Sequence, residues 1–257
     1  SAILGLLLFL YSFTLPNVSI NNNKEKKSLS DALGLKAFAL FKERKMAIFF
    51  IFSMFLGVSL QITNGYANPF ITSFKDIPEY TNSWGANNAN ALISLSQVSE
   101  TLCILLIPFF LKKFGIKKVM LMSMFAWFLR FGLFGLGDPG SNVWMFILSM
   151  IVYGVAFDFF NVSGSLFVDK ETSPEIRSSA QGVFMMMTNG FGATLGMLVA
   201  GEVVNHFVFS KTDIIEQLKG WEISWYIFAI YALIIGILFA IVFRYKHSPE
   251  DVKSITH

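Results

Sequence analysis

Charged side chains are scarce in this sequence, and their scarcity restricts the class of protein more than any motif does. Only 14% of the 257 residues are Asp, Glu, Lys or Arg, whereas 54% are hydrophobic and 16% are aromatic. Soluble domains carry about 25% charged residues, enough to form a solvated surface around their core. A chain of this length could bury a large core, but it has too little charge to cover one. The composition therefore indicates an integral membrane protein.

Other absences exclude further classes. The one cysteine, Cys103, lies in an apolar run, so an internal disulfide is excluded. The chain has no glycine-rich phosphate loop, and the histidines His206, His247 and His257 do not form a metal-ligand pattern. We therefore expect neither an ATP-driven motor nor a metal or organic cofactor. The net charge of +3 is small and the basic residues lie mostly between the apolar runs, which disfavours a nucleic-acid partner.

The chain enters a hydrophobic run at its first residues. Residues 2–15 have no basic segment before them and no small-residue cleavage site after them, so a signal peptide is not expected. The interpretation that fits is that residues 1–16 are the end of a transmembrane helix whose start is missing. We accordingly expect the sequence to be a fragment of a longer protein.

Six further apolar runs are long enough to cross a bilayer. A helical span needs about 20 apolar residues to cross about 30 Å of hydrocarbon. The runs cover residues 46–67, 89–111, 119–137, 143–168, 179–209 and 221–243. They are continuous and lack period-2 alternation, so the spans should be helices. The predicted fold class is an all-α membrane protein, with a six-transmembrane-helix bundle over residues 46–247 and a tail over 248–257.

A polar segment separates the partial helix from the bundle. Residues 17–45 begin with a run rich in Asn and Lys, and then apolar residues such as Leu33 and Phe38 alternate with charged ones. This pattern predicts a loop containing a short amphipathic helix that Ser30 or Asp31 could cap. Whether that helix lies on the membrane surface or packs on the bundle is left open by the sequence.

The distribution of Lys and Arg predicts the orientation in the membrane. Sixteen of the 20 basic residues fall in the 17–45 loop, the two other loops on the same side and the C-terminal tail. The opposite loops hold Lys75, Lys211 and Lys219. Because cytoplasmic loops carry an excess of Lys and Arg, we expect the 17–45 loop and the tail to be cytoplasmic. The expected location is a cytoplasmic or inner membrane.

Ionisable side chains occur well inside three of the predicted spans. They are Glu100, Arg130 and Asp158, and Asp158 stands between two phenylalanines. An ionised side chain at mid-membrane costs at least about 2.5–3.5 kcal/mol on insertion scales, so each is a candidate for function. Arg130 could instead be the structural partner that neutralises a carboxylate.

Amides and aromatic rings occur on the same spans as the carboxylates. Spacing on a helix places them on shared faces or one turn apart. The set is Gln61 with Asn64, Gln97 with Glu100, and Tyr153 with Phe157 beside Asp158. Polar faces turned to lipid would be costly, so we expect them to line a solvated cavity. An isolated amide would instead form an interhelical hydrogen bond worth about 0.6 kcal/mol.

The chemistry of such a cavity follows from its groups. Amides present a donor beside an acceptor, which suits the edge of a heterocycle, and carboxylates accept hydrogen bonds from sugar hydroxyls. Desolvation favours the protonated form of a carboxyl group, so Asp158 and Glu100 are candidates for carrying a proton.

The fifth run contains a stripe of small residues at Gly192, Gly196 and Ala200, a spacing typical of closely packed helices. Gln181 and Asn189 fall in the same run.

Several long segments resemble the C-terminal half of the nucleoside:H⁺ symporter family of the major facilitator superfamily. In order, between about Leu33 and Tyr245, they are "LGLKAFALFKERKMAIFFIFSMFLG", "LQITN", "SQVSETL", "MIVYGVAFDFFNVSGSLFV" and "SAQGVFMMMTNGFG". The resemblance implies that the six spans are helices 7–12, that residues 1–16 end helix 6, and that the N-terminal six-helix half is missing. It also implies nucleoside contacts at Gln61, Asn64, Gln97, Glu100, Tyr153, Phe157 and Asp158, and proton coupling through Asp158 or Glu100.

The predicted function is import of nucleosides together with protons by alternating access about a site near the bilayer midplane. Three alternatives stay open. One is a sugar or polyol symporter of the same fold, and another is a non-transporting membrane subunit. The third, an intramembrane enzyme that uses Asp158 and Glu100 as a catalytic pair, is disfavoured because no protease-type motif accompanies them.

Overall fold

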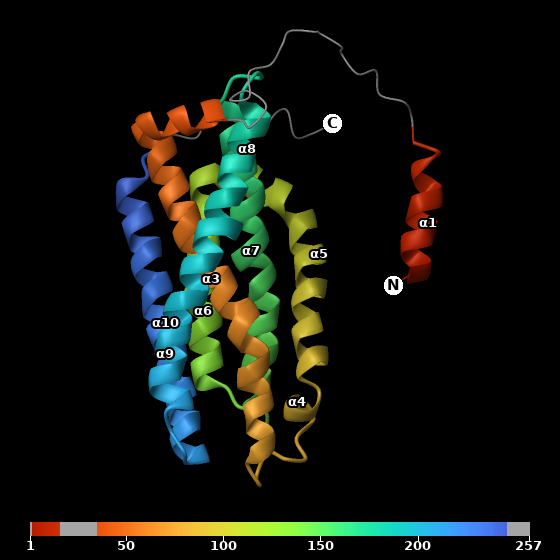
Figure 1. Cartoon of the computed structure of the whole chain (residues 1–257), viewed down its shortest axis with the longest axis vertical. Helices are drawn as coiled ribbons and strands as arrows, with labels where there is room; N and C mark the ends of the chain where they lie inside the picture. The colour runs from red at the N-terminus through yellow and green to blue at the C-terminus, as the bar shows by residue number, and fades with distance from the viewer. Residues whose placement is uncertain (1, 16–34, 246–257) are drawn as a thin grey trace. The chain divides into compact units, whose positions relative to one another are not determined.

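The computed structural model describes residues 2–15 and 35–245 (Figure 1). It divides into two units, residues 1–33 and residues 34–257, and each is described by itself. In the first unit, α1 (Ala2–Ser12) is a single apolar helix. The proposed capping residues Ser30 and Asp31 lie outside the described residues.

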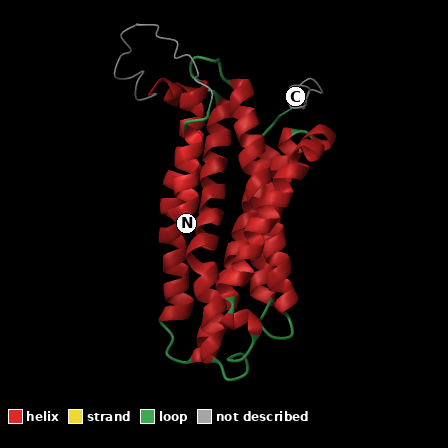
Figure 2. Cartoon of the chain, turned by 90° about the vertical axis from the view of Figure 1, so that its right-hand side faces the viewer, coloured by secondary structure: helices red, strands yellow, loops and turns green. Residues whose placement is uncertain are grey.

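The second unit is a bundle of six membrane-length helices that run up and down in turn (Figures 1 and 2). Four spans are single α-helices: α3 (Arg44–Ser73), α5 (Ala89–Phe114), α6 (Ile116–Leu136) and α7 (Val143–Glu171). The fifth span joins α8 (Arg177–Met185), η3 (Met186–Gly192), α9 (Ala193–Val204) and η4 (Asn205–Phe209). The sixth is α10 (Ile214–Val242). The predicted all-α bundle of six spans is confirmed.

The first span is longer than the apolar run predicted. It continues from residue 67 to Ser73, with Pro69 inside the helix. Proline removes one backbone donor and usually interrupts a helix in water. Within a membrane bundle, neighbouring helices and local adjustments satisfy the freed carbonyl, so the helix continues.

The fifth span crosses α3 with almost no space between the two backbones. A Cβ atom on Gly57 would lie 2.1 Å from the carbonyl oxygen of Thr188, and one on Gly192 would lie 2.4 Å from that of Met54. Gly196 faces the same helix, and Ala200 is fully buried. The structure therefore confirms that the small-residue stripe permits close packing. The approach coincides with η3, a stretch of π-helix that the apolar pattern did not predict.

A short 3-10 helix, η1 (Leu35–Lys42), precedes the first span. Ala37 and Leu40 are buried in the core, whereas the Phe38 side chain is exposed. The described part of the amphipathic segment thus packs Ala37 and Leu40 against the bundle, where η1 contacts α3 and α8. Beside it, the Lys45 ammonium forms an ion pair of 2.5 Å with the Glu171 carboxylate, which ties the start of α3 to the end of α7.

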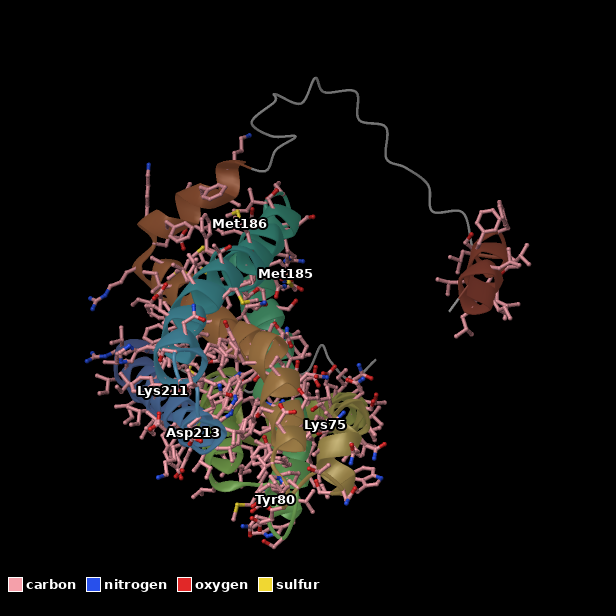
Figure 3. All side chains as sticks on the ribbon, turned by 60° about the horizontal axis from the view of Figure 1, so that its bottom comes forward. Lys75, Tyr80, Met185, Met186, Lys211 and Asp213 are labelled. Atoms are coloured by element: carbon pink, nitrogen blue, oxygen red, sulfur yellow. The ribbon has the colours of Figure 1, made fainter. Side chains whose placement is uncertain are left out.

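Chain reversals at the other end of the bundle connect α3 to α5 and the fifth span to α10. Figure 3 labels Lys75, Tyr80, Lys211 and Asp213 in these reversals. The reversal between α3 and α5 contains the short helices η2 (Phe74–Asp76) and α4 (Trp84–Asn87). The Asp213 carboxylate accepts a hydrogen bond from the Glu216 N–H at 3.1 Å and so caps α10.

The α5 helix is the least embedded of the six spans. Its outward side chains include Val98, Leu102, Leu105 and Phe109, which are all exposed. It packs mainly against α7 and makes few contacts with α3. The resulting separation of α3 and α5 leaves room for the site described next.

Candidate functional site

A polar cavity of about 420 Å³ lies between α3 and α5, beside α6 and α7. Its lining residues are Thr63, Asn64, Ala67, Asn68, Asn90, Ile93, Ser96, Gln97, Glu100, Arg130 and Tyr153. Four of the seven predicted site residues are therefore brought together here: Asn64, Gln97, Glu100 and Tyr153. The volume is within the range of small-molecule sites, and the few polar groups in the wall can orient a ligand.

The other three predicted residues lie outside the cavity wall. Gln61 is on α3, one turn before Asn64. The Phe157 ring stacks on the Tyr153 ring, with 5.8 Å between centroids and 4° between planes. Asp158 is 5% exposed and directly follows Phe157 on α7. None of these three predicted residues is part of the cavity wall.

A close helix crossing determines where Glu100 lies. A Cβ atom on Gly154 of α7 would lie 2.7 Å from the carbonyl oxygen of Ser99. The Ser99 hydroxyl donates a hydrogen bond to the carbonyl of Ile151, so the two helices are joined at this point. Glu100 follows directly, and the absence of a side chain at Gly154 thus lets α5 bring it near Tyr153.

Arg130 is the fully buried cation of the site, with 1% of its surface exposed. Its Nη1 donates a hydrogen bond of 2.6 Å to the Ser149 carbonyl on α7. Its guanidinium carbon lies 4.5 Å from the centroid of the Tyr153 ring and 5.0 Å from that of Phe134. None of the carboxylates in residues 35–245 forms an ion pair with it, although Glu100 is close enough to attract it. The role of structural charge partner therefore stays a prediction that rests on this longer-range attraction.

Asp158 and Glu100 form a pair of interacting carboxylates. The Asp158 Oδ2 atom is buried and has no hydrogen-bond partner within the described part of the chain. The negative charge of Glu100 is near enough to repel that of Asp158. A proton on either group would remove the repulsion, and a proton on Asp158 would also remove a buried charge. Protons on two such interacting groups belong to the pair rather than to one residue.

Two asparagines that the sequence analysis did not select complete one end of the cavity. The Asn68 Nδ2 donates a hydrogen bond of 2.6 Å to the Asn90 Oδ1, which links α3 to α5. Asn68 follows Asn64 by four residues and Gln61 by seven, so helical spacing alone could have identified it. Asn90 gave no such signal because it stands near the start of its span.

The amides of the fifth span have other roles. The Gln181 Nε2 donates hydrogen bonds of 2.7 Å to the Asp169 carboxylate and 2.8 Å to the Ser165 carbonyl. These bonds connect α8 to α7 away from the cavity. Asn189 is exposed and its amide contacts the Met185 sulfur at 3.6 Å. Neither amide lines the cavity between α3 and α5.

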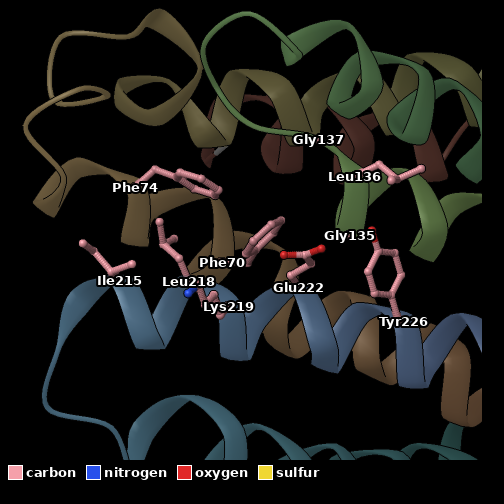
Figure 4. Close-up of a pocket in the computed structure, with 10 residues that line it drawn as sticks. All are labelled: Phe70, Phe74, Gly135, Leu136, Gly137, Ile215, Leu218, Lys219, Glu222 and Tyr226. Carbon is pink, nitrogen blue, oxygen red and sulfur yellow. The ribbon is translucent and has the colours of Figure 1, made fainter.

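A second cavity, of about 340 Å³, lies between α10 and the ends of α3 and α6 (Figure 4). Its wall is largely apolar and includes Phe70 of α3, Phe74 of η2, Leu136 of α6 and Leu218 of α10. Figure 4 shows the Glu222 carboxylate at its centre. It holds none of the seven predicted site residues. Among residues 2–15 and 35–245 no group of three His, Cys, Asp or Glu side chains could hold a metal ion.

Six membrane-length helices, four of which line a cavity with polar side chains, define a multi-pass membrane protein. Residues 1–248 match the profile of the Nucleoside H+ symporter family, and the chain belongs to that family. This confirms the family indicated by the sequence motifs, and that family is one of transporters rather than enzymes.

Two relatives from Escherichia coli (strain K12) are similar along the whole chain. The nucleoside permease NupG is 49% identical over 259 residues, which cover 100% of this chain and 60% of the permease. The xanthosine permease is 49% identical over 256 residues, which cover 98% of this chain and 60% of that protein. A crystal structure of a mutant of the nucleoside transporter NupG has a TM-score of 0.82 at 49% identity, over 95% of this chain and 59% of that one. The chain thus spans about three-fifths of the length of its relatives.

Proposed function

We propose that this chain forms the C-terminal half of a proton-coupled nucleoside transporter that imports nucleosides by alternating access. The observation that carries the proposal is the cavity between α3 and α5, in which amides, a carboxylate and an aromatic ring converge inside a membrane bundle. The names of the two similar permeases support nucleosides as the class of substrate.

The substrate contacts follow from the chemistry of the wall. Asn64 and Gln97 offer paired donors and acceptors to the edge of a nucleobase, and Glu100 accepts hydrogen bonds from ribose hydroxyls. The Tyr153 ring, extended by its stacking on Phe157, packs against a flat ring or the sugar. Gln61 and Asp158 lie beyond the wall in this structure, so in our proposal they contact substrate when the cavity is open further along α3 and α7.

Proton coupling in this proposal uses the interaction between Glu100 and Asp158. With both groups ionised, the two helices carry repelling charges in a medium of low dielectric constant. Protonation of one of them removes a charge that would otherwise have to move with the helices. The loaded carrier can then reorient, whereas the empty and unprotonated one reorients slowly.

The proposal also includes a second membrane half and an orientation. We assign residues 1–16 to the end of a preceding transmembrane helix and residues 17–45 to a cytoplasmic loop between two halves. Residues 46–247 form the bundle, and residues 248–257 form a cytoplasmic tail. The excess of Lys and Arg in the loop and tail supports this orientation in the inner or cytoplasmic membrane. The N-terminal six-helix half would supply the opposite wall of the site, as in other transporters built from two repeats.

Competition between substrates tests the proposed substrate class. Uptake of labelled uridine by the full-length protein in liposomes is measured with excess unlabelled adenosine, ribose or glucose. We expect adenosine to compete and the two sugars to have little effect, because the amides require a base. A matched pair of variants, Gln97→Ala in the cavity and Gln217→Ala outside it, should separate substrate binding from general damage.

Two outcomes would contradict the proposal. Competition by ribose as strong as that by adenosine would favour the sugar or polyol symporter. Absence of uptake by folded full-length protein would favour the non-transporting subunit.

A further inference from the structure

A groove of about 530 Å³ lies where the first span of the bundle begins and the last one ends. Its lining residues are Arg44, Lys45, Ile48, Val242, Phe243 and Arg244. Three of these six side chains are cations and none is a carboxylate. The groove is therefore positively charged, with an apolar part formed by α3 and the end of α10.

The three cations differ in how their charge is compensated. The Lys45 ammonium is paired with Glu171 at 2.5 Å and lies 4.8 Å from the centroid of the Tyr245 ring. Arg44 and Arg244 are exposed, and neither is hydrogen-bonded or ion-paired to another residue in the described ranges. Glu43 precedes Arg44 but does not line the groove. Two arginines from opposite ends of the bundle sequence thus line one groove, and no carboxylate lines it with them.

Their position along the helices places both arginines at a membrane boundary. Arg44 is the first residue of α3, and Arg244 follows the last residue of α10 by two positions. Ile48 is one turn inside the first span, and Val242 ends the last. The charged side of the groove therefore lies at the edge of the hydrocarbon, and its apolar side continues into it.

We propose that this groove binds the headgroup of an anionic phospholipid. The lipid phosphate would accept hydrogen bonds from Arg44 and Arg244, since the planar guanidinium donates two parallel bonds to phosphate oxygens. One acyl chain would run past Ile48 and Val242. Basic pockets between helix ends at a membrane surface suit such headgroups, because acidic lipids concentrate there. The bound lipid would join α3 to α10, the first and last helices of the bundle.

Native mass spectrometry of the full-length protein in neutral detergent tests this proposal. Bound lipid is counted as phosphatidylglycerol or phosphatidylcholine with identical acyl chains is titrated in. We expect the wild type to bind phosphatidylglycerol more tightly. The double variant Arg44→Gln/Arg244→Gln should weaken that binding about tenfold, because two charge-assisted bonds to phosphate are lost. Inorganic phosphate at equal concentration should not compete, since it lacks the acyl chain.

A matched control separates this groove from general basicity. Lys112→Gln/Lys113→Gln removes the same charge at the end of α5, at the same end of the bundle but outside the groove. It should leave phosphatidylglycerol binding within about twofold of wild type, as expected for screened surface charges. If Arg44→Gln/Arg244→Gln misfolds, Arg44→Lys/Arg244→Lys replaces it. This variant keeps the charge but not the two parallel bonds to phosphate, and its affinity for phosphatidylglycerol should still fall several-fold.

The proposal is overturned by any of three results. The first is equal binding of the two lipids by the wild type. The second is a loss of phosphatidylglycerol affinity in Lys112→Gln/Lys113→Gln equal to that in Arg44→Gln/Arg244→Gln. The third is full competition by inorganic phosphate.

Discussion

The Arg130 guanidinium of α6 lies over the face of the Tyr153 ring of α7, 4.5 Å from its centroid. The same side chain donates a hydrogen bond to the carbonyl of Ser149, one turn earlier on α7. One buried arginine thus holds two points of the helix that carries Tyr153, Phe157 and Asp158. Tyr153 and Arg130 both line the cavity, so Arg130 also holds a neighbouring wall residue in place.

This relationship predicts a large effect of removing the guanidinium. Arg130→Gln should lower the free energy of unfolding by about 2–4 kcal/mol, because it leaves the Ser149 carbonyl and part of the core without their partner. Tyr153→Phe keeps the ring face under the cation and should cost less than about 1 kcal/mol. Chemical denaturation in detergent micelles, followed by tryptophan fluorescence, measures both. An Arg130→Gln protein as stable as wild type would show that the arginine does not hold α7.

The crossing of α5 and α7 predicts a position-specific effect of an added methyl group. At Gly154 a Cβ atom would lie 2.6 Å from the Ser99 hydroxyl oxygen, so Gly154→Ala must push α5 and Glu100 away. We expect a loss of about 1–3 kcal/mol of stability, typical of overpacking, together with weaker nucleoside binding. Gly132→Ala is the control, because a Cβ atom there has no neighbour within 4 Å. Binding measured by isothermal titration should fall for the first variant and not for the second; equal affinity in both would contradict the crossing.

The turn between α3 and α5 contains a tyrosine whose ionisation depends on its surroundings. Burial raises the pKa of the Tyr80 phenol above its ordinary value of 10.0, and the negative charges of Asp138 and Glu79 raise it further. The folded protein therefore holds this proton more tightly than the unfolded chain does. The corresponding stabilisation is complete below pH 10 and is lost as the pH rises through the raised pKa.

Titration of tyrosine labelled with ¹³C at Cζ tests this prediction, with Tyr80→Phe identifying the resonance. Asp138→Asn should shift the Tyr80 midpoint to lower pH, because one repelling charge is removed while an oxygen remains to accept the Gly140 N–H hydrogen bond. A midpoint that does not move, or that moves upward, would contradict the assigned cause.

The spans could be predicted from the sequence because hydropathy is a local property. Each of the six apolar runs became a helix of membrane length, and the small-residue stripe at Gly192 and Gly196 gave the contact with α3. The ends were less accurate: α3 runs on through Pro69, since its neighbours in the bundle tolerate the missing donor. The π-helical turns of η3 coincide with the close approach of the two backbones at Gly57, and that approach is a property of packing rather than of one segment.

The candidate site could be predicted in part for a similar reason. Charges and paired amides inside apolar runs identified Asn64, Gln97 and Glu100, because burying them without a partner is costly. Single polar residues such as Thr63, Ser96 and Asn90 gave no signal of their own. They became part of the cavity only because α5 packs on α7 and stands away from α3. The sequence also could not show that Asp158 lies outside the cavity wall that Tyr153 lines.

The central claim is that the carboxylates Asp158 and Glu100, inside the spans, couple nucleoside entry to protons, and Asp158→Asn tests it most directly. Full-length wild type and variant are reconstituted in liposomes, and uptake of labelled uridine is followed with and without an inward proton gradient. Asn keeps the size and polarity of the side chain but carries neither the charge nor the exchangeable acid proton. We predict that the wild type accumulates uridine above its external concentration when the gradient is present. The variant should lose that accumulation and retain exchange of uridine at equal concentrations. Gradient-driven accumulation by Asp158→Asn equal to that of wild type would contradict a role of this aspartate in coupling.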